Sequence, residues 1–236
     1  IAMWSGPRNI STAMMRSFEN RADTVVVDEP FYACYLHLTG IDHPMREEVI
    51  ASQPTDWRVV AGVLSGDLEG ADIIYQKHMT HHMLPQIDLG WTSTLQNCFL
   101  IRDPAHVVKS YSSKRDTLSQ DDIGIRRQLE LYEEISSITG QDIPVIEATR
   151  FLADPEAALR RLCKRLAIPF SADMLHWPRG RRASDGVWAP HWYEAVEQST
   201  GFRAAAPTVS LSRSQQAIAD EAREYYEVLL AKSLAE

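Results

Sequence analysis

The stretch IAMWSGPRNISTAMMRSFEN, residues 1–20, decides the fold of this chain. An apolar start stops at a turn, and a helical pattern headed by Ser11 and Thr12 follows at once. The first turn of a helix leaves backbone N–H groups without partners and carries a partial positive charge, to which Arg8 adds a full one. Gly6 lets the backbone bend or approach a ligand without a Cβ in the way. The stretch therefore predicts a strand, an anion-binding turn and a helix, unless Ser11 and Thr12 only cap an ordinary turn.

Short apolar runs alternate with amphipathic segments along the rest of the chain. Runs of strand length, rich in Val and Ile, lie at residues 24–27, 72–75, 98–101 and 144–146. The clearest helical patterns lie at residues 104–114, 123–138, 155–167 and 212–234. Such alternation predicts an α/β fold of three layers, in which helices flank both faces of a parallel sheet. We expect a single domain over residues 1–236, because no repeat or obvious linker interrupts the pattern.

Charged or hydrogen-bonding side chains follow each of the predicted strands. Glu29 follows the second strand, Lys77 and His78 follow the third, and Arg102 follows the fourth. Ligands of parallel sheets bind beyond the carboxyl ends of the strands, so we expect these side chains to share one site. Glu29 could act as a base with a raised pKa, or it could pair with Arg8 and organise the turn.

The composition narrows the classes of partner. Among 236 residues there are 24 basic and 32 acidic side chains, and the net charge of −8 argues against a nucleic-acid partner. No apolar stretch approaches the roughly 18 residues that a membrane span needs. Three scattered cysteines without CxxC spacing indicate reduced thiols in a cytoplasmic protein. The histidines at residues 78–82 lack a Cys or carboxylate at ligand spacing, so we expect no metal site. We expect a monomer or homodimer that acts on a small molecule.

The turn after the first strand resembles the loop with which sulfotransferases bind the 5′-phosphosulfate of 3′-phosphoadenosine 5′-phosphosulfate (PAPS), commonly written PRSGTT. Pro7, Arg8 and Thr12 match that pattern, whereas Ile10 departs from it. The turn differs from the GxxxxGK[ST] P-loop, because Arg8 stands where Lys would and only one glycine is present. The resemblance implies that PAPS is held by Gly6, Pro7, Arg8, Asn9, Ile10, Ser11 and Thr12.

A second segment, RDPAHVVKSY at residues 102–111, resembles the sulfotransferase motif RxPxxxxxSxY. Its pattern is the end of a strand followed by a helix that Pro104 begins. In that family the Arg and Ser of the motif bind the 3′-phosphate, which implies this role for Arg102 and Ser110. The planar fork of an arginine suits phosphate oxygens. Arg102 could instead pair with Asp103 or close the end of the sheet.

The resemblance also implies catalytic groups. The run at Lys77 and His78 is similar to the KxHLP segment of the family, which implies charge neutralisation by Lys77 and proton abstraction by His78. Adjacent strand residues face opposite ways, however, so His78 stands turned from the family position. Glu29 matches the carboxylate base of tyrosylprotein-type sulfotransferases, and Arg8 would stabilise charge on the transferred group. A late basic segment implies a 3′-phosphate contact for Arg182. The late segment also contains a group of aromatic residues and a histidine: Trp188, His191, Trp192 and Tyr193. They could line a pocket for the acceptor, or they could equally form a core that anchors an irregular segment.

As a whole the chain resembles a bacterial sulfotransferase-like protein, and it is also similar to a domain of proteins labelled branched-chain aminotransferase-like. The resemblance implies a P-loop NTPase-like sulfotransferase fold and transfer of a sulfuryl group from PAPS to a hydroxyl or amine, with adenosine 3′,5′-bisphosphate (PAP) as product. One alternative is a small-molecule kinase or nucleotide hydrolase in which Asp28 and Thr12 hold Mg²⁺. Another is a non-catalytic nucleotide-binding protein that has lost the base.

Overall fold

Five parallel strands form one sheet in the order β2-β3-β1-β4-β5 in the computed structural model, which describes residues 1–66, 71–112, 118–204 and 208–234. The strands are β1 (Ala2–Ser5), β2 (Thr24–Asp28), β3 (Ile73–Met79), β4 (Asn97–Ile101) and β5 (Val145–Glu147). The α-helices are α1 (Ser11–Glu19), α2 (Tyr32–Thr39), α3 (Arg46–Ser52), α4 (Trp57–Leu64), α5 (Pro104–Tyr111), α6 (Gln120–Ile123), α7 (Ile125–Thr139), α8 (Ala148–Ala153), α9 (Pro155–Arg165), α10 (Ala189–Trp192), α11 (Glu194–Glu197) and α12 (Arg213–Leu230). Short 3₁₀ turns are η1 (Thr80–His82), η2 (Gly90–Thr94) and η3 (Ala172–Leu175).

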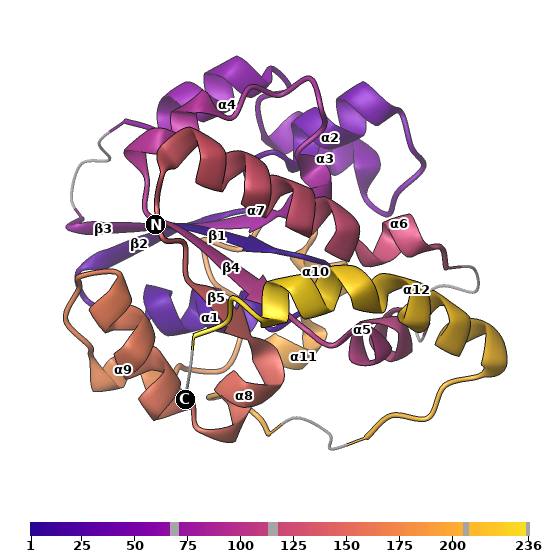
Figure 1. The fold of residues 1–236 in the computed structure, drawn as a ribbon. Coiled ribbons are helices and arrows are strands. Elements are labelled where there is room, and N and C mark those ends of the chain that lie inside the picture. The colour runs from indigo at the N-terminus through magenta and orange to yellow at the C-terminus, as the bar shows by residue number, and fades with distance from the viewer. Residues whose placement is uncertain (67–70, 113–117, 205–207, 235–236) are drawn as a thin grey trace.

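Alternate residues of the central strand β1 enter two hydrophobic clusters, one on each face of the sheet. Trp4 belongs to the cluster that includes buried residues of α4, α7 and α12. Met3 belongs to the cluster that includes buried residues of α1, α8 and α9. Figure 1 shows α4 and α7 on one side of the sheet and α1 and α9 on the other. This is the three-layer α/β arrangement that the alternation of strands and helices predicts.

The third strand differs from its predicted bounds. The predicted strands at residues 24–27, 98–101 and 144–146 correspond to β2, β4 and β5, but β3 continues beyond residue 75 to Met79. Three of its four added residues are polar and buried: Gln76, Lys77 and His78. Gln76 donates from Nε2 to the backbone oxygen of Leu64 at 2.8 Å, which satisfies its buried amide. Lys77 and His78 therefore lie within a strand, where the prediction had them follow one.

The predicted helices also change at their ends. The helix predicted at residues 212–234 corresponds to α12, which ends at Leu230, and the one predicted at residues 155–167 corresponds to α9, which ends at Arg165. The pattern at residues 123–138 is divided between α6 and α7, because Gly124 adopts a positive φ of 72°. A Cβ at Gly124 would lie 3.3 Å from Cδ of Pro7, so the break in the helix also allows the turn after β1 to pack closely. The helix predicted at residues 104–114 corresponds to α5, and residues 113–117 lie outside the described part of the chain.

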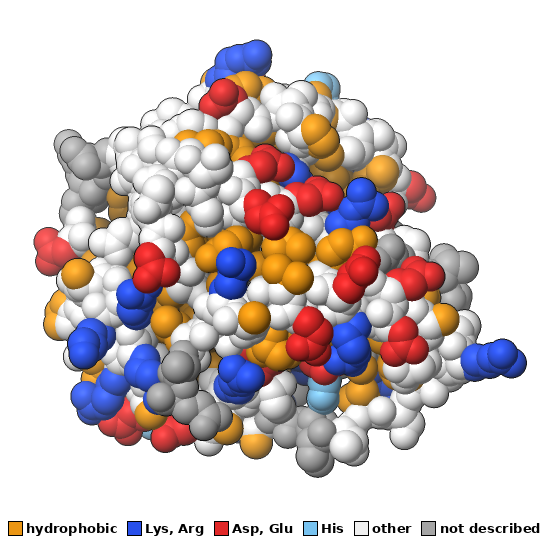
Figure 2. All heavy atoms as spheres, in the orientation of Figure 1, with side chains coloured by type: hydrophobic (Ala, Val, Ile, Leu, Met, Phe, Trp, Pro, Cys, Tyr) orange, Lys and Arg blue, Asp and Glu red, His pale blue; other side chains and the backbone are white. Residues whose placement is uncertain are grey.

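The surface carries charges of both signs. Figure 2 shows acidic and basic side chains interspersed with small hydrophobic areas on the face that includes α7 and α12. Within the described ranges, none of the helices combines the length and the apolar character that crossing a bilayer requires.

Candidate functional site

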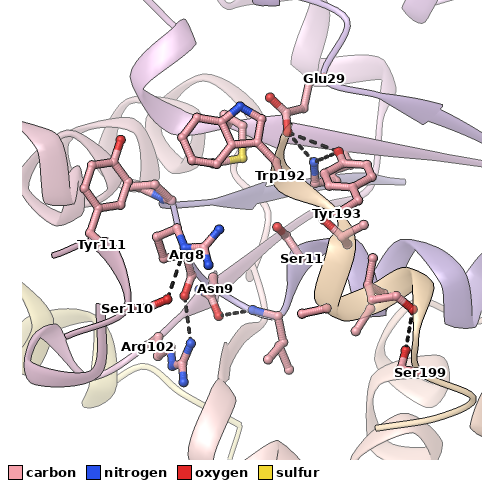
Figure 3. A pocket seen from close by; sticks show the side chains of 18 of the residues that line it. Arg8, Asn9, Ser11, Glu29, Arg102, Ser110, Tyr111, Trp192, Tyr193 and Ser199 are labelled. Carbon is pink, nitrogen blue, oxygen red and sulfur yellow. Dashed lines mark hydrogen bonds and ion pairs between the residues drawn. The ribbon is translucent and has the colours of Figure 1, made fainter. Parts of the chain in front are cut away.

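A cavity of about 370 Å³ opens at the carboxyl ends of the central strands, where parallel sheets bind their ligands. Its wall combines the turn and helix after β1, the end of β3, residues of α5 and a late segment around Trp192. Figure 3 shows Arg8, Ser110 and Arg102 on one side of this cavity and Glu29 with Tyr193 on the other. Segments that are far apart in the sequence therefore meet at one site.

The turn after β1 is fixed by hydrogen bonds to the end of β4. Asn9 donates from Nδ2 to the backbone oxygen of Leu100 at 2.7 Å, and its Oδ1 accepts from the backbone N–H of Ile10 at 2.8 Å. Arg8 adopts a positive φ of 52°, which is strained for a residue with a side chain. Arg102 holds this conformation by donating from Nη1 to the backbone oxygen of Arg8 at 2.8 Å. Two segments that the sequence separates by more than ninety positions thus form one unit.

The N-terminus of α1 faces the cavity without a side-chain cap. The N-cap residue, Ile10, makes no capping hydrogen bond with its side chain, and the first turn of α1 contains no acidic residue. Ser11, Thr12 and Ala13, which begin the helix, all line the cavity. Free backbone N–H groups and the positive end of the helix dipole favour an anion at this position. The alternative that Ser11 and Thr12 merely cap the helix therefore finds no support.

Two arginines add positive charge beside this helix end. Arg8 donates from Nε to Oγ of Ser110 at 3.1 Å, so the turn and α5 meet through the two residues that the motifs single out. Burial lowers the pKa of Arg8, and burial together with the nearby Arg8 lowers the pKa of Arg102. Within the described ranges neither guanidinium forms an ion pair with a carboxylate. Two adjacent, half-buried cations of this kind are stabilised by a bound anion.

Asp103 does not serve as the partner of Arg102. Its Oδ1 accepts from the backbone N–H of Ala105 at 2.8 Å and so caps α5. The same oxygen lies 3.6 Å from Arg223 of α12. The guanidinium of Arg102 is therefore left at the cavity wall.

A buried polar network forms the opposite wall. Lys77 donates from Nζ to Oδ1 of Asp28 at 2.9 Å, to Oε1 of Glu29, and to Oη of Tyr193 at 2.7 Å. Glu29 thus pairs with Lys77, and the interpretation in which it pairs with Arg8 is wrong. Glu29 itself has a positive φ of 41°, and its backbone N–H donates to the backbone oxygen of Lys77 at 2.9 Å. This backbone bond fixes the carboxylate at the end of β2.

The network shifts the pKa of both of its ends. Burial raises the pKa of Glu29, and the positive charge of Lys77 only partly opposes that shift. Burial would lower the pKa of Lys77, but the charges and hydrogen bonds of Asp28 and Glu29 outweigh it, so the pKa of Lys77 is raised. A carboxylate with raised proton affinity at a cavity wall, beside a firmly protonated lysine, has the properties of a general base next to a charge stabiliser.

Aromatic and imidazole rings continue this wall away from the arginines. Tyr32 stacks on His82 with ring centroids 4.5 Å apart, and its Oη lies 2.6 Å from Nδ1 of His43. Burial lowers the pKa of His82 well below its usual value, so the ring stays neutral. The ring centroids of Trp192 and His43 lie 5.8 Å apart. The sequence motifs do not indicate Tyr32 or His43, although both line the cavity. His81 and His82, which could take the place of His78 if the chain bends, line it as well.

The structure does not bring every predicted site residue to the cavity. His78 lies on the other face of the sheet, because it pairs in register with Trp4, and its ring stacks on Trp4 at 4.3 Å. It is 1% exposed, and burial lowers its pKa to about 3. Gly6 also lies behind the wall, where a Cβ would come 3.3 Å from the backbone oxygen of Ile123. The placement of His78 corrects the expectation that it acts as a base, and Gly6, which we expected to contact the ligand, is not among the residues that line the cavity.

Arg182 likewise lies away from the cavity. Its backbone N–H donates to Asp185 at 2.8 Å, and its side chain lies 3.8 Å from Glu19 at the end of α1. The late segment instead contributes Arg203 to the wall. The expectation that Arg182 contacts the 3′-phosphate is therefore not supported by this placement. Trp192 and Tyr193 line the cavity, whereas Trp188 is buried beneath them.

We call residues 184–203 the cover segment, and it rests on α1. Arg16 of α1 forms a buried ion pair with Asp185 at 2.6 Å. Ser17 donates to the backbone oxygen of Met174 at 2.7 Å, and Asn20 donates to that of Asp173 at 2.9 Å, just before the cover segment. The helix that presents its N-terminus to the cavity therefore also supports the segment on the other side of it.

Comparison with known proteins agrees with this architecture. A sulfotransferase domain family model matches residues 1–233. Among solved structures, a sulfotransferase from Alicyclobacillus acidocaldarius superimposes with a TM-score of 0.59 and 10% identity, covering 99% of this chain and 96% of that one. The sulfotransferase domain from the curacin biosynthetic pathway superimposes with a TM-score of 0.54 and 16% identity, covering 93% and 95%. At such identities the superpositions show the fold, which is that of P-loop NTPase-like sulfotransferases.

Two curated relatives carry a different name. Branched-chain-amino-acid aminotransferase-like proteins 1 and 2 of Arabidopsis thaliana are 39% and 36% identical to this chain over 203 residues. The match covers 86% of this chain and 36% of each relative, so the chain spans about a third of the length of these proteins. With a family model that spans nearly all of its residues, the chain belongs to the sulfotransferase family.

Proposed function

We propose that this chain transfers a sulfuryl group from PAPS to a hydroxyl or amine of a small acceptor. The observation that carries the proposal is the meeting of two anion-binding elements in one cavity. The uncapped start of α1 with Arg8 is one, and Arg102 with Ser110 is the other. A donor with phosphate groups at both its 5′ and 3′ ends needs two such elements.

In this proposal the donor lies across the ends of β1 and β4. The backbone N–H groups at the start of α1 and the guanidinium of Arg8 hold the 5′-phosphosulfate. Arg102 and Ser110 hold the 3′-phosphate. Arg8 and Lys77 neutralise negative charge that builds on the leaving phosphate oxygen as the sulfur–oxygen bond breaks. Arginine forks and a helix N-terminus supply this charge without a metal ion.

Glu29 is the base in the proposed reaction. It lines the cavity, has a raised pKa and lies next to Lys77. The acceptor oxygen or nitrogen attacks sulfur while Glu29 takes its proton, and the electron pair of the broken bond stays on PAP. Tyr32, His43, His82 and Trp192 surround the acceptor side with aromatic and imidazole rings, which suits an acceptor whose body is flat.

Ligand titration tests the proposal. PAP, PAPS and ATP–Mg²⁺ are each titrated against the protein while its thermal midpoint is followed. Saturating ligand at about 100 times its Kd adds about 2.7 kcal/mol to stability. For a chain of this size that raises the midpoint by about 5–10 °C. A rise with PAP and PAPS but not ATP–Mg²⁺ supports the proposal, a rise only with ATP–Mg²⁺ supports a kinase or nucleotide hydrolase, and no rise refutes donor binding.

The substitution Glu29→Gln then separates binding from chemistry. We expect PAP affinity to change less than about threefold, because Gln keeps the size of the side chain and the main-chain contacts of Glu29. Transfer from PAPS to acceptors from a phenol, alcohol and amine library should fall by at least about a hundredfold, since the base is lost. Full transfer activity in Glu29→Gln would exclude Glu29 as the base.

A further inference from the structure

The hydrogen-bonding capacity of Lys77 is filled by the protein itself. An ammonium group has three N–H donors, and those of Lys77 go to Asp28, Glu29 and Tyr193. The side chain is 1% exposed, so water does not supply a further partner. Lys77 can therefore donate to a bound phosphosulfate only after it gives up one of these three bonds.

Tyr193 cannot easily be the partner that is released. Its Oη accepts from Lys77 and from Nε1 of Trp188, the latter at 3.1 Å, and its own proton points to the carboxylate of Asp28 at 2.7 and 2.8 Å. One donor and two acceptor sites are all that a hydroxyl has. Breaking the bond to Lys77 would leave a buried lone pair without a partner.

Asp28 is held in the same way. Asp28 accepts hydrogen bonds from Lys77 and Tyr193, and its Oδ2 also accepts from the backbone N–H of Gly186 at 3.2 Å. Its side chain is 1% exposed, and it does not line the cavity. Asp28 thus lies behind Lys77, where a ligand in the cavity does not reach it directly, whereas Tyr193 lines the cavity but has all of its hydroxyl bonds filled.

Glu29 is the exchangeable partner. Its side chain is 11% exposed, the highest value among the groups bonded to Lys77 through carboxylates, and it lines the cavity. Its Oε2 lies 4.0 Å from Nε2 of His82, so this oxygen already faces the aromatic wall. A ligand that arrives in the cavity competes with Glu29, and with neither Asp28 nor Tyr193, for an N–H donor of Lys77.

We infer that Tyr193 is a positioning residue that holds Lys77 at the cavity edge. When PAPS binds, one N–H group of Lys77 stops donating to Glu29 and donates to the phosphosulfate instead. The inference rests on the proposed function. Lys77 keeps its three protons throughout, and only the acceptor of one hydrogen bond changes. Glu29 then loses its cation and takes the proton of the acceptor as the new sulfur–oxygen or sulfur–nitrogen bond forms. The bridging oxygen leaves with PAP.

The change of hydrogen bond at Lys77 would make PAPS binding come before proton abstraction by Glu29. Without PAPS, Glu29 stays bonded to Lys77, and the ammonium opposes the rise in pKa that burial causes, so Glu29 is a weaker base than it would be without this bond. With a donor in place, the same carboxylate is freed at the moment when it is needed. Binding of PAPS should therefore strengthen the base on the acceptor side, whereas PAP, which lacks the sulfuryl group, should do so less.

The experiment compares Tyr193→Phe with a matched control from the same strand as Lys77. Tyr75 of β3 is also fully buried, and its hydroxyl has no hydrogen-bond partner in the described structure. Tyr75→Phe therefore removes a buried hydroxyl without breaking a bond. In ¹⁵N-lysine-labelled protein, the ammonium resonance of Lys77 is assigned by its loss in Lys77→Arg. We expect a slowly exchanging signal in the unsubstituted protein and in Tyr75→Phe, and exchange at least about tenfold faster in Tyr193→Phe.

The affinities for PAPS and PAP supply the second readout. Calorimetric titration should show PAPS affinity about tenfold weaker in Tyr193→Phe, with PAP affinity within about threefold of the unsubstituted protein. PAPS should also shift the Lys77 resonance more than PAP does. Trp188→Phe, which removes the second donor to Tyr193 together with part of a buried ring, should give a smaller change of the same sign in the exchange rate of Lys77.

The outcomes separate this inference from the function on which it rests. An unchanged Lys77 signal and unchanged PAPS affinity in Tyr193→Phe overturn the positioning role. Equal losses of PAP and PAPS affinity also overturn it, because they would mean general damage to the site. If the unsubstituted protein binds neither PAP nor PAPS, the proposed function fails, while the exchange rate of the Lys77 ammonium still decides whether Tyr193 holds it.

Discussion

Acid should destabilise this protein through its buried histidines. Burial lowers the pKa of His78 to about 3 and that of His81 to about 4, and it lowers that of His82 well below its usual value of 6.5. The unfolded chain binds these protons more tightly than the folded chain. Stability contributed by the neutral rings is therefore present above about pH 6.5 and is lost as the pH falls. Glu29 acts in the opposite direction, because its raised pKa lets the folded chain take a proton first.

The size of the effect follows from the shift of a single ring. A histidine whose pKa falls from 6.5 to about 3 loses about 2 kcal/mol between about pH 7 and pH 5, on the linkage relation. His78→Phe removes this term while keeping a ring against Trp4, on which His78 stacks at 4.3 Å. The variant leaves Oε1 of Gln76 without its partner, at a cost of about 1 kcal/mol that does not depend on pH.

Urea denaturation at the two pH values measures the difference. We expect the free energy of unfolding of the unsubstituted protein to fall by about 2 kcal/mol more than that of His78→Phe. His37→Phe is the control, because His37 lies exposed on α2. An equal loss in the unsubstituted protein and His78→Phe would refute the reasoning that His78 is neutral because it is buried.

Two further substitutions test the arginine wall of the cavity and the contact by which α1 supports the cover segment. Arg102→Lys keeps the charge but loses the planar fork, so PAP affinity should fall about tenfold by calorimetry, and unchanged affinity would exclude phosphate contact at this position. Arg16→Met removes one half of the buried pair with Asp185 and should cost about 3–5 kcal/mol in urea denaturation. Arg160→Met, at an exposed pair with Glu156, should cost less than about 1 kcal/mol, and equal costs for the two would contradict the role of burial.

Features that depend on neighbours in the sequence could be predicted. The strand, turn and helix at residues 1–20 are continuous in the chain, so their apolar pattern and their charges stand side by side in the sequence. Arg102 and Ser110 belong to one strand-to-helix connection, and their spacing alone brings both to one end of the sheet. The three-layer fold follows from the alternation of strands and helices.

Features that depend on distant partners could not be predicted. The polar residues Gln76, Lys77 and His78 suggest the end of a strand, yet β3 continues through them because each finds a buried partner. Tyr193 bonds Asp28 across 165 positions, and nothing in its local pattern distinguishes a site residue from a core residue. Arg182 lies in a basic stretch, but its backbone bond to Asp185 fixes it beside α1.

The dependence of the cover segment on α1 has a consequence for how the site comes apart. Arg16, Ser17 and Asn20 bond the cover segment and the chain just before it to the same helix whose first turn faces the cavity. Local opening of proteins occurs in contiguous cooperative units, and elements that share buried polar contacts open together. Amide hydrogens of α1 and of the residues around Tyr193 should then exchange with similar protection. Heat or denaturant would release the donor-binding wall and the acceptor-facing wall in a single step, leaving no partly formed site that binds one substrate alone.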